Sequence, residues 1–343
     1  MGRLARKLHV GVRGSLDIEL EHSCILPGET IKGYVRLHVK KPIVTSGLSV
    51  IIGGWERLYW ETTDHCGMRW HRRSFKLLHV PLPLFEPGTL NGATTTINAG
   101  TYDYPFACQL PSVLPASFEY TAHRIQSMER VRVSIVYSVD ASLAVEGFMK
   151  ADLMHSAPFV IPPGIRSLPV PVPTDQPLVF VKRQDVRALG MIKQGAFHVS
   201  MTLESNIIDA SSTIVAHVQL ENASKSPLKA ICLRLVEDIS IDRHRKHFNR
   251  TRSTSRVIGC RFYAAKTLKA MLSRASGPNL TLQLPVTPND IYGFEPLLPT
   301  MSSQHIIALR YRVELECSFT LSEHICVEAP VLVIRGPSRA LLA

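Results

Sequence analysis

The sequence lacks the features that mark secreted and membrane-spanning chains. No apolar run approaches the ~18 residues that a transmembrane helix needs. The basic start, MGRLARKLHVGVRGS, has no apolar stretch of the kind found in a signal peptide. The seven cysteines are scattered, odd in number and without a C-x-x-C pair, a pattern typical of reduced thiols. These absences predict a cytoplasmic protein.

Motifs for catalysis and metal binding are also missing. The chain has no G-x-S-x-G, no phosphate-binding P-loop, no G-x-G-x-x-G and no H-E-x-x-H. The pairs His244/His247 and His65/Cys66 lack a second pair of ligands at zinc-site spacing. We therefore expect a non-enzymatic protein that needs no cofactor and holds no metal.

Acidic residues are absent from two long windows. Residues 243–289 contain no Asp or Glu but ten positive side chains, which account for nearly all of the net charge of +11. They are Arg243, Arg245, Lys246, Arg250, Arg252, Arg256, Arg261, Lys266, Lys269 and Arg274. A smaller acid-free window, residues 65–85, carries Arg69, Arg72, Arg73 and Lys76. A binding role for anions is the first function that this distribution suggests.

Proline is concentrated in one segment near the middle of the chain. Residues 161–177, IPPGIRSLPVPVPTDQP, contain six prolines in 17 positions. Proline fixes φ and donates no ladder hydrogen bond, so the segment predicts a stiff, extended linker. The predicted organisation is a domain at 1–160, the linker at 161–177, a domain at 178–336 and a tail at 337–343.

Strand patterns dominate both halves. Residues 30–39 alternate apolar and polar side chains, and residues 48–60 form a further predicted strand with a bulge at Gly53-Gly54. We expect the basic residues 68–78 to form a loop or the flank of a hairpin. No amphipathic helix of three turns or more is evident. Many short strands predict an all-β protein built from antiparallel sandwiches.

The second half repeats the first. TIKGYVRL at 30–37 and TIVAHVQL at 213–220 share Thr, Ile, Val and Leu at the same four positions. A Q-L-P sequence ends at Pro111 and again at Pro285, and each is followed 26 residues later by a tyrosine, Tyr137 and Tyr311. This shared order predicts duplication of one sandwich.

Four segments resemble the arrestin family, in particular its arrestin-domain-containing (α-arrestin) branch. They are PGETIKGYV (27–35), GLSVIIGGWERLYW (47–60), YPFACQLPSVLPASFE (104–119) and VRVSIVYSVDASL (131–143), and the resemblance extends over roughly 16–336. It implies two tandem antiparallel immunoglobulin-like β-sandwiches, arrestin-like N and C domains. It also implies a non-enzymatic scaffold or adaptor that binds cytoplasmic parts of membrane proteins in endocytic trafficking or protein transport.

The function implied by the resemblance has an alternative. The chain contains no PPxY motif, so we expect no PPxY-mediated docking of ubiquitin ligases. A retromer-like subunit of a coat or peripheral membrane complex, bound to anionic lipid, would share the fold. The expected location is cytoplasmic, with a peripheral position at the plasma membrane or endosomes as the alternative.

The basic window 243–261 is the main candidate site. Its alternation of charged and small residues predicts exposed strands or a hairpin, where charge either protects a sheet edge or binds phosphorylated tails and anionic phospholipid headgroups. The candidates are Arg243, Arg245, Lys246, Arg250, Arg252, Arg256 and Arg261. Phosphorylation at 253–255 would lower this charge. Nucleic acid is not expected, since aromatic residues are few here.

A second basic contact is predicted in the N-terminal half. The candidates are Arg3, Arg6, Lys7, Arg69, Arg72 and Arg73. The first three rest only on the resemblance, which implies basic contact residues near the first strand of the N domain.

Overall fold

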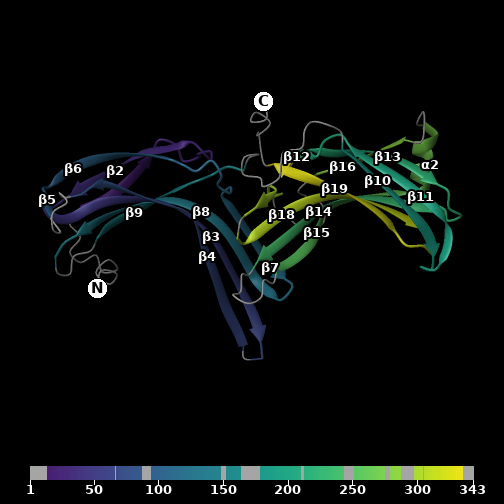
Figure 1. Cartoon of the computed structure of the whole chain (residues 1–343), viewed down its shortest axis with the longest axis horizontal. Coiled ribbons are helices and arrows are strands. Elements are labelled where there is room, and N and C mark those ends of the chain that lie inside the picture. Colours follow the sequence, from purple (N-terminus) through teal and green to yellow (C-terminus); the bar gives the residue numbers. More distant parts are fainter. Residues whose placement is uncertain are drawn as a thin grey trace. The chain divides into compact units, whose positions relative to one another are not determined.

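The structure is a computed structural model, and it separates into two compact units, Met1–Ser167 and Leu168–Ala343 (Figure 1). It describes residues 14–65, 67–86, 94–147, 152–163, 178–209, 212–242, 251–274, 279–286, 297–303 and 305–334. The division falls within the predicted linker, of which only 161–163 are described. The predicted tail at 337–343 lies outside the described residues. Among the described residues, no helix is both long and apolar enough to cross a membrane.

The first unit contains two antiparallel sheets. The smaller has the order β1 (Gly14–Leu20), β2 (Thr30–Val39) and β6 (Gly100–Gln109). The larger has the order β4 (Gly67–Phe85), β3 (Ile43–Asp64), β8 (Met128–Val145) and β7 (Phe118–Ile125), with β5 (Thr95–Ile97) beside β3 and β9 (Leu153–Phe159) beside β8. In β2 the apolar residues Ile31, Val35 and Leu37 are fully buried, as their period-two alternation predicts.

The second unit repeats this arrangement. One sheet has the order β10 (Leu178–Ala188), β11 (Ile192–Leu203), β13 (Thr213–Asn222) and β16 (Asn279–Pro285). The other has the order β12 (Ile207–Asp209), β19 (Ile325–Ile334), β18 (Ile307–Phe319), β14 (Leu228–Asp242) and β15 (Thr251–Ala264), with β17 (Met301–Ser302) beside β18. The run β15–β14–β18–β19 corresponds to β4–β3–β8–β9. The all-β class of two tandem sandwiches is confirmed.

The two repeated tyrosines occupy matching places in the two units. Tyr137 in β8 is 2% exposed and donates its hydroxyl hydrogen bond to the carbonyl of Pro115 over 2.7 Å. Tyr311 in β18 is equally buried, and its hydroxyl lies 2.8 Å from the carbonyl oxygen of Leu298. In each unit the tyrosine joins a central strand to an irregular segment earlier in the chain.

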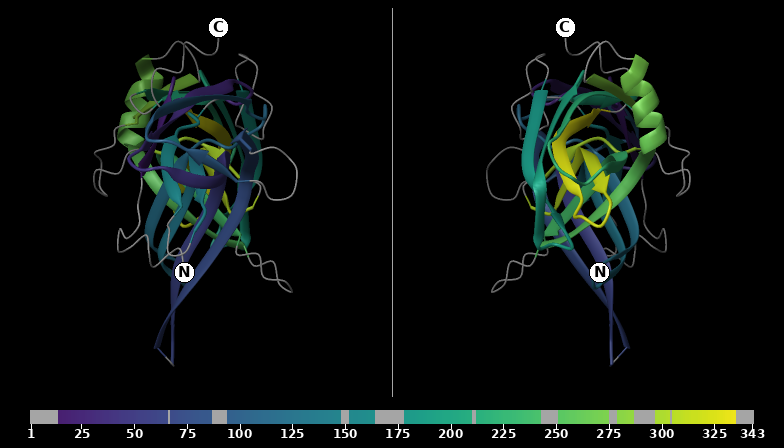
Figure 2. Two further views of the ribbon diagram at one scale, coloured as in Figure 1. Left: turned by 90° about the vertical axis from the view of Figure 1, so that its left-hand side faces the viewer. Right: turned by 90° about the vertical axis from the view of Figure 1, so that its right-hand side faces the viewer.

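The hairpin of β3 and β4 is much longer than its sequence indicates. The predicted strand at 48–60 extends over 22 residues, and the basic residues 68–78 belong to the 19-residue strand β4. Figure 2 shows this hairpin continuing past the other strands of its own sheet. Pairing with β3 along its whole length keeps β4 extended, although its exposed, charged side chains give no clear alternation. The register shifts between Gly54 and Trp55, where Leu77 of β4 is the extra residue. The irregularity therefore lies beside the predicted position but on the partner strand, while Gly53 and Gly54 pair regularly with both neighbours.

A short helix, α2 (Ala265–Arg274), follows β15 and was not expected from the sequence. Its ten residues make less than three turns. Leu268 is its one buried apolar side chain among those described, and its first turn has no acidic residue to complement the helix dipole. The local sequence therefore carries little of the usual helix signal.

Candidate functional site: two basic surfaces

One face of the β3–β4 hairpin alternates aromatic and cationic side chains. Lys76 pairs with Trp55 across the two strands, and its Nζ lies 5.6 Å from the centroid of the indole ring. Arg72 pairs with Tyr59, and its guanidinium carbon lies 5.3 Å from the centroid of that ring. Trp70, two residues farther along, is 70% exposed. We call these five residues the cation–aromatic face.

The opposite face of the hairpin is packed around Leu58 and Trp60, whereas its residues Arg69 and Arg73 are exposed. Trp60 is 3% exposed and stacks on His71 with ring centroids 4.8 Å apart. The side chains of Thr62 and His71 are hydrogen-bonded over 2.8 Å. Arg69 and Arg73 alternate with the cation–aromatic residues and share the face of His71. The structure thus separates the three predicted arginines, since Arg72 lies on one face and the other two on the opposite face.

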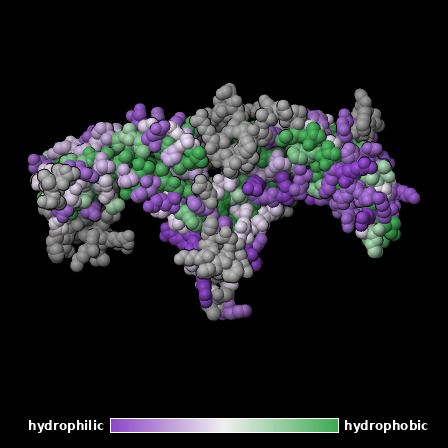
Figure 3. All heavy atoms as spheres, in the orientation of Figure 1, coloured by the Kyte–Doolittle hydropathy of each residue, from purple (hydrophilic) through white to green (hydrophobic). Residues whose placement is uncertain are grey.

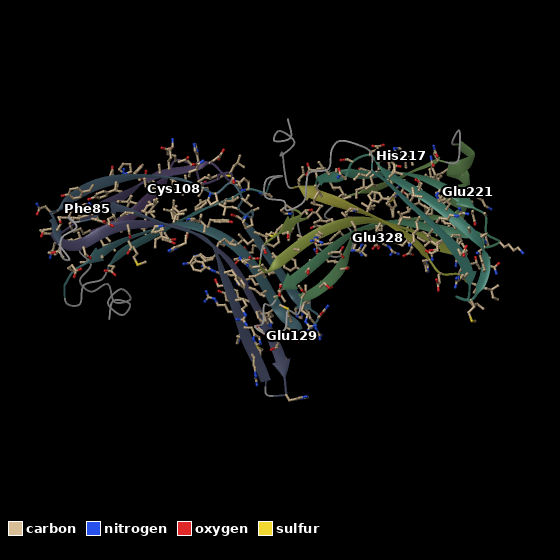
Figure 4. The ribbon with its side chains drawn as sticks, in the orientation of Figure 1. Phe85, Cys108, Glu129, His217, Glu221 and Glu328 are labelled. Carbon is tan, nitrogen blue, oxygen red and sulfur yellow. The ribbon has the colours of Figure 1, made fainter. Side chains whose placement is uncertain are left out.

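Two acidic groups near the cation–aromatic face already have partners, and one of them, Glu61 of β3, lies on that face opposite Trp70. Glu61 is 1% exposed, and its Oε1 lies 3.3 Å from Nη1 of Arg130. Glu129 of β8, labelled in Figure 4, accepts a hydrogen bond from Thr63 over 3.2 Å. Figure 4 also shows nitrogen-bearing side chains along the hairpin, and Figure 3 shows the visible part of its end as hydrophilic. The charge of Glu61 is therefore balanced by Arg130, while Glu129 accepts only a neutral hydroxyl donor.

The described part of the predicted C-terminal site lies on β15. The described part of the window, 251–261, forms a strand paired with β14, as predicted for these residues. Strand β15 is the last strand of its sheet in the part of the chain described. Arg252, Arg256 and Arg261 pair with Ile241, Glu237 and Leu233 of β14, so all three lie on one face. The other candidates, Arg243, Arg245, Lys246 and Arg250, lie outside the described residues, as do Arg3, Arg6 and Lys7.

Two of the described arginines, Arg256 and Arg261, differ in what they contact. Arg256 binds the carboxylate of Glu237, which is 1% exposed, through Nε and Nη2, each 3.1 Å from Oε1. Arg261 donates to the carbonyl of Gln283 over 3.2 Å and lies 5.7 Å from the ring centroid of Tyr263. The charge of Arg256 is thus matched inside the unit, and Arg261 stays exposed at its surface. Sequence alone could not reveal the pairing of Arg256 and Glu237, because it depends on the strand register.

Ser255 lies on the other face of β15. Its hydroxyl donates to Oδ1 of Asp238 over 2.6 Å. A phosphate at this position would face a carboxylate, and like charges repel.

A cluster of Glu314, Cys326 and Glu328 brings possible metal ligands within 4.8 Å of one another. However, Nη2 of Arg312 lies 2.8 Å from Glu314, and its Nε lies 3.6 Å from Glu328. Burial raises the pKa of Cys326 to about 11, so its thiol stays protonated near neutral pH. The cluster is better described as an ion-pair network around Arg312 than as a metal centre.

The second unit also exposes apolar side chains at one end, which sequence reasoning missed. Leu189, Met191 and Ile192 in the β10–β11 turn are 68%, 81% and 58% exposed. The backbone N–H of Leu189 donates to the carbonyl of Leu321, a residue 73% exposed in the neighbouring β18–β19 turn. We call these four residues the apolar tip, which is green in Figure 3 at the end of the β10–β11 hairpin. An apolar turn, where turns are usually polar, was the available signal.

Comparison with known proteins identifies the family. The arrestin (or S-antigen) N-terminal domain model matches residues 15–163, and the C-terminal domain model matches residues 193–338. This chain belongs to the arrestin family. It is 23% identical over 337 residues to the arrestin domain-containing protein A of Dictyostelium discoideum. The matched region covers 93% of this chain and 51% of that protein. The chain therefore spans about half the length of this relative.

The comparison confirms the arrestin resemblance and its α-arrestin-like character. Proteins of the arrestin family are non-enzymatic adaptors and scaffolds. This agrees with the non-enzymatic role predicted from the missing catalytic motifs.

Proposed function

We propose that this arrestin-family chain is a cytoplasmic adaptor in membrane-protein transport. In this proposal it binds acidic or phosphorylated cytoplasmic segments of membrane proteins through the cation–aromatic face. The observation that carries the proposal is the placement of the exposed Arg72 and Lys76 over the half-buried rings of Tyr59 and Trp55.

The chemistry of this face suits phosphate and carboxylate groups. A guanidinium group can pair bidentately with such anions, whereas an ammonium group acts as a point charge. The aromatic rings hold the cationic side chains in place and so reduce the conformational entropy that binding would cost. Trp70 adds an exposed apolar surface of the kind found at binding hot spots.

The apolar tip supports a peripheral position on a membrane. Exposed clusters of large apolar residues are rare on proteins that act as monomers in water. Insertion of Leu189, Met191 and Ile192 into the headgroup region of a bilayer would bury this surface. We propose the plasma membrane or endosomes as the location, and the basic window at 243–261 as an additional contact with anionic headgroups.

The cation–aromatic face is tested with a tail peptide. Fluorescence anisotropy would compare a peptide carrying two phosphoserines with its unphosphorylated form, at low and high salt. The Arg72→Ser/Lys76→Ser variant should lose the phosphopeptide binding. Lys40→Ser/Lys41→Ser removes the same charge from an exposed turn of the same unit and should bind normally. Equal loss in both variants would show that net charge alone matters and would reject the face as the site.

The membrane contact is tested by liposome co-sedimentation with and without phosphoinositide. One variant changes Arg243, Arg245, Lys246, Arg250 and Arg252 to Ser, and a second changes Leu189 and Met191 to Ser. Salt-sensitive loss in the first supports headgroup binding by the basic window. Unchanged binding in both would reject the peripheral location. A pull-down that returns coat subunits in fixed stoichiometry would instead favour the retromer-like alternative.

A further inference from the structure

The sandwich of the second unit is open along one side. A cavity of about 340 Å³ lies between the edge strands β15 and β16. It is lined by Leu235 of β14, Ile258–Arg261 of β15, and Leu284, Pro285 and Val286 at the end of β16. This site lies in a different unit from the cation–aromatic face, and it overlaps the basic window at 243–261 through Ile258–Arg261.

The floor of this groove is part of the hydrophobic core. Leu235 is 1% exposed and Leu284 is 3% exposed, and they come from the two opposing sheets. Between them Gly259 contributes no side chain. A Cβ built on Gly259 would meet only Cδ1 of Leu284, at 3.9 Å, within 4 Å. The position therefore has room for a side chain that this chain does not provide.

The two edge strands differ in their ability to accept another strand. On β16, the hydroxyl of Tyr263 donates to the carbonyl of Gln283 over 2.8 Å and accepts from its N–H over 2.9 Å. Pro285, two residues farther, has no N–H to donate. In contrast, the 14-residue strand β15 pairs only with β14 among the described residues. A strand added to this side of the sandwich would therefore pair with β15.

The charge around the groove defines what such a strand would carry. Register places Arg256, Gly259 and Arg261 at successive positions on one face, because Ile258 is the extra residue of a bulge. Arg261 lines the cavity itself. Residues 243–289 include no acidic side chain, and the nearby Glu237 is bound to Arg256.

We infer that β15 and this groove form a docking site for an extended acidic peptide of a partner protein. The peptide would extend the sheet by pairing with β15, and one aliphatic side chain would enter the groove beside Gly259. An acidic residue two positions away would reach Arg261, since alternate residues of a strand share a face. The recognised pattern is an aliphatic residue with an acidic residue two positions before or after it.

Charge selects this occupant over a second copy of the chain. Two β15 strands would bring their arginines together, which disfavours pairing between copies. The same positive charge favours an acidic strand and should make its binding sensitive to salt.

The test uses the full chain and a fluorescein-labelled probe, Ser-Glu-Ser-Leu-Ser-Glu-Ser, in an anisotropy titration. A probe with Ser in place of Leu, and one with Lys in place of both Glu residues, should each bind at least about tenfold more weakly. Two further probes carry backbone N-methyl groups, one on the Leu and Glu residues and the other on the Ser residues. A strand donates to its partner through alternate N–H groups only, so one of these probes should lose binding and the other should keep it.

Protein variants locate the site. Gly259→Phe should fill the groove, and Arg261→Gln should remove the charge contact. Each variant should bind the probe about tenfold more weakly or worse than the natural chain does. Val181→Phe, a similar change at an exposed position of the other edge strand β10, should bind as well as the natural chain. Circular dichroism melting checks each fold, and the probe variants test the proposal without any change to the protein. Binding that survives Gly259→Phe, or survives both N-methyl probes, would overturn the proposal. So would self-association of the natural chain that Gly259→Phe abolishes.

Discussion

The ring of Tyr137 lies against the backbone of Gly54, its partner on the neighbouring strand, and leaves no space for a side chain there. A Cβ on Gly54 would lie 2.6 Å from two ring carbons of Tyr137 and 3.1 Å from Cβ of Leu78. The ring cannot easily move aside, because its hydroxyl is bound to the carbonyl of Pro115. The glycine is therefore required by packing.

The Gly54→Ala variant should be less stable than the natural chain by about 1–3 kcal/mol, the usual cost of overpacking a core. Gly53→Ala is the matched control, because a Cβ on Gly53 would come no closer than 3.7 Å to any atom. Urea unfolding followed by tryptophan fluorescence would measure both. Equal stability of the two variants would show that Tyr137 can move and would refute the packing argument.

Much of the fold follows from local sequence. The strand at 30–39 has the bounds that its alternation predicts, and the equal spacing from Pro111 to Tyr137 and from Pro285 to Tyr311 reflects the repeated architecture. The alternation can be recognised because it depends on a single strand with a buried face, and the equal spacing can be recognised because the same order of strands occurs twice.

The basic surfaces depend instead on pairing between strands. Strand β4 has mostly exposed, charged side chains, so its extended form comes from its partner β3 and not from its own periodicity. The pairing of Arg72 with Tyr59 and of Lys76 with Trp55 depends on a register that shifts between Gly54 and Trp55. The contact of Arg256 with Glu237 crosses a bulged hairpin. The order of residues in the sequence does not reveal which residues become partners across two strands.

Arg256→Gln should destabilise the second unit. The carboxylate of Glu237 would remain buried while losing its charged partner, and an imperfectly matched buried polar group costs about 1–3 kcal/mol. Arg261→Gln removes a similar charge from the same face of β15 at an exposed position and should change stability less. Thermal unfolding of both variants would measure the difference. The Glu237→Gln/Arg256→Gln double variant should recover part of the stability lost in Arg256→Gln. A double variant that loses more stability than the two single variants together would contradict the pairing.

Two thiols should resist alkylation in the folded chain. Burial raises the pKa of Cys317 to about 12 and that of Cys326 to about 11, so both are protonated at pH 8 and only the thiolate reacts. Iodoacetamide at pH 8, followed by mass spectrometry, should modify the exposed Cys24 and Cys260 first, and all four should react in urea. Fast modification of Cys317 without urea would contradict its burial.

The same shift implies a pH dependence of stability. An unfolded cysteine has a pKa of about 8.5, so the unfolded chain loses its thiol protons first as the pH rises. The contribution of Cys317 to stability is therefore complete below about pH 8.5 and decreases as the pH rises toward its folded pKa of about 12. The Cys317→Ala variant should show a weaker decline of unfolding free energy between pH 8 and pH 10 than the natural chain. An unchanged slope would mean that other groups control this range.

A negative charge at Ser255 should destabilise the β14–β15 hairpin. The hydroxyl of Ser255 lies 2.6 Å from Oδ1 of Asp238, its partner across the two strands, so Ser255→Glu would place two carboxylates opposite each other. Like charges at such positions cost about 0.2–1 kcal/mol. Ser255→Gln is the control, because it has nearly the same size without the charge. The difference in melting temperature between the two variants should shrink at high salt, since Ser255 is exposed and Asp238 is only half-buried, so that salt screens their repulsion. If the Glu variant melts no lower than the Gln variant at low salt, then Asp238 does not repel a charge at this position, and phosphorylation of Ser255 would be compatible with the folded hairpin.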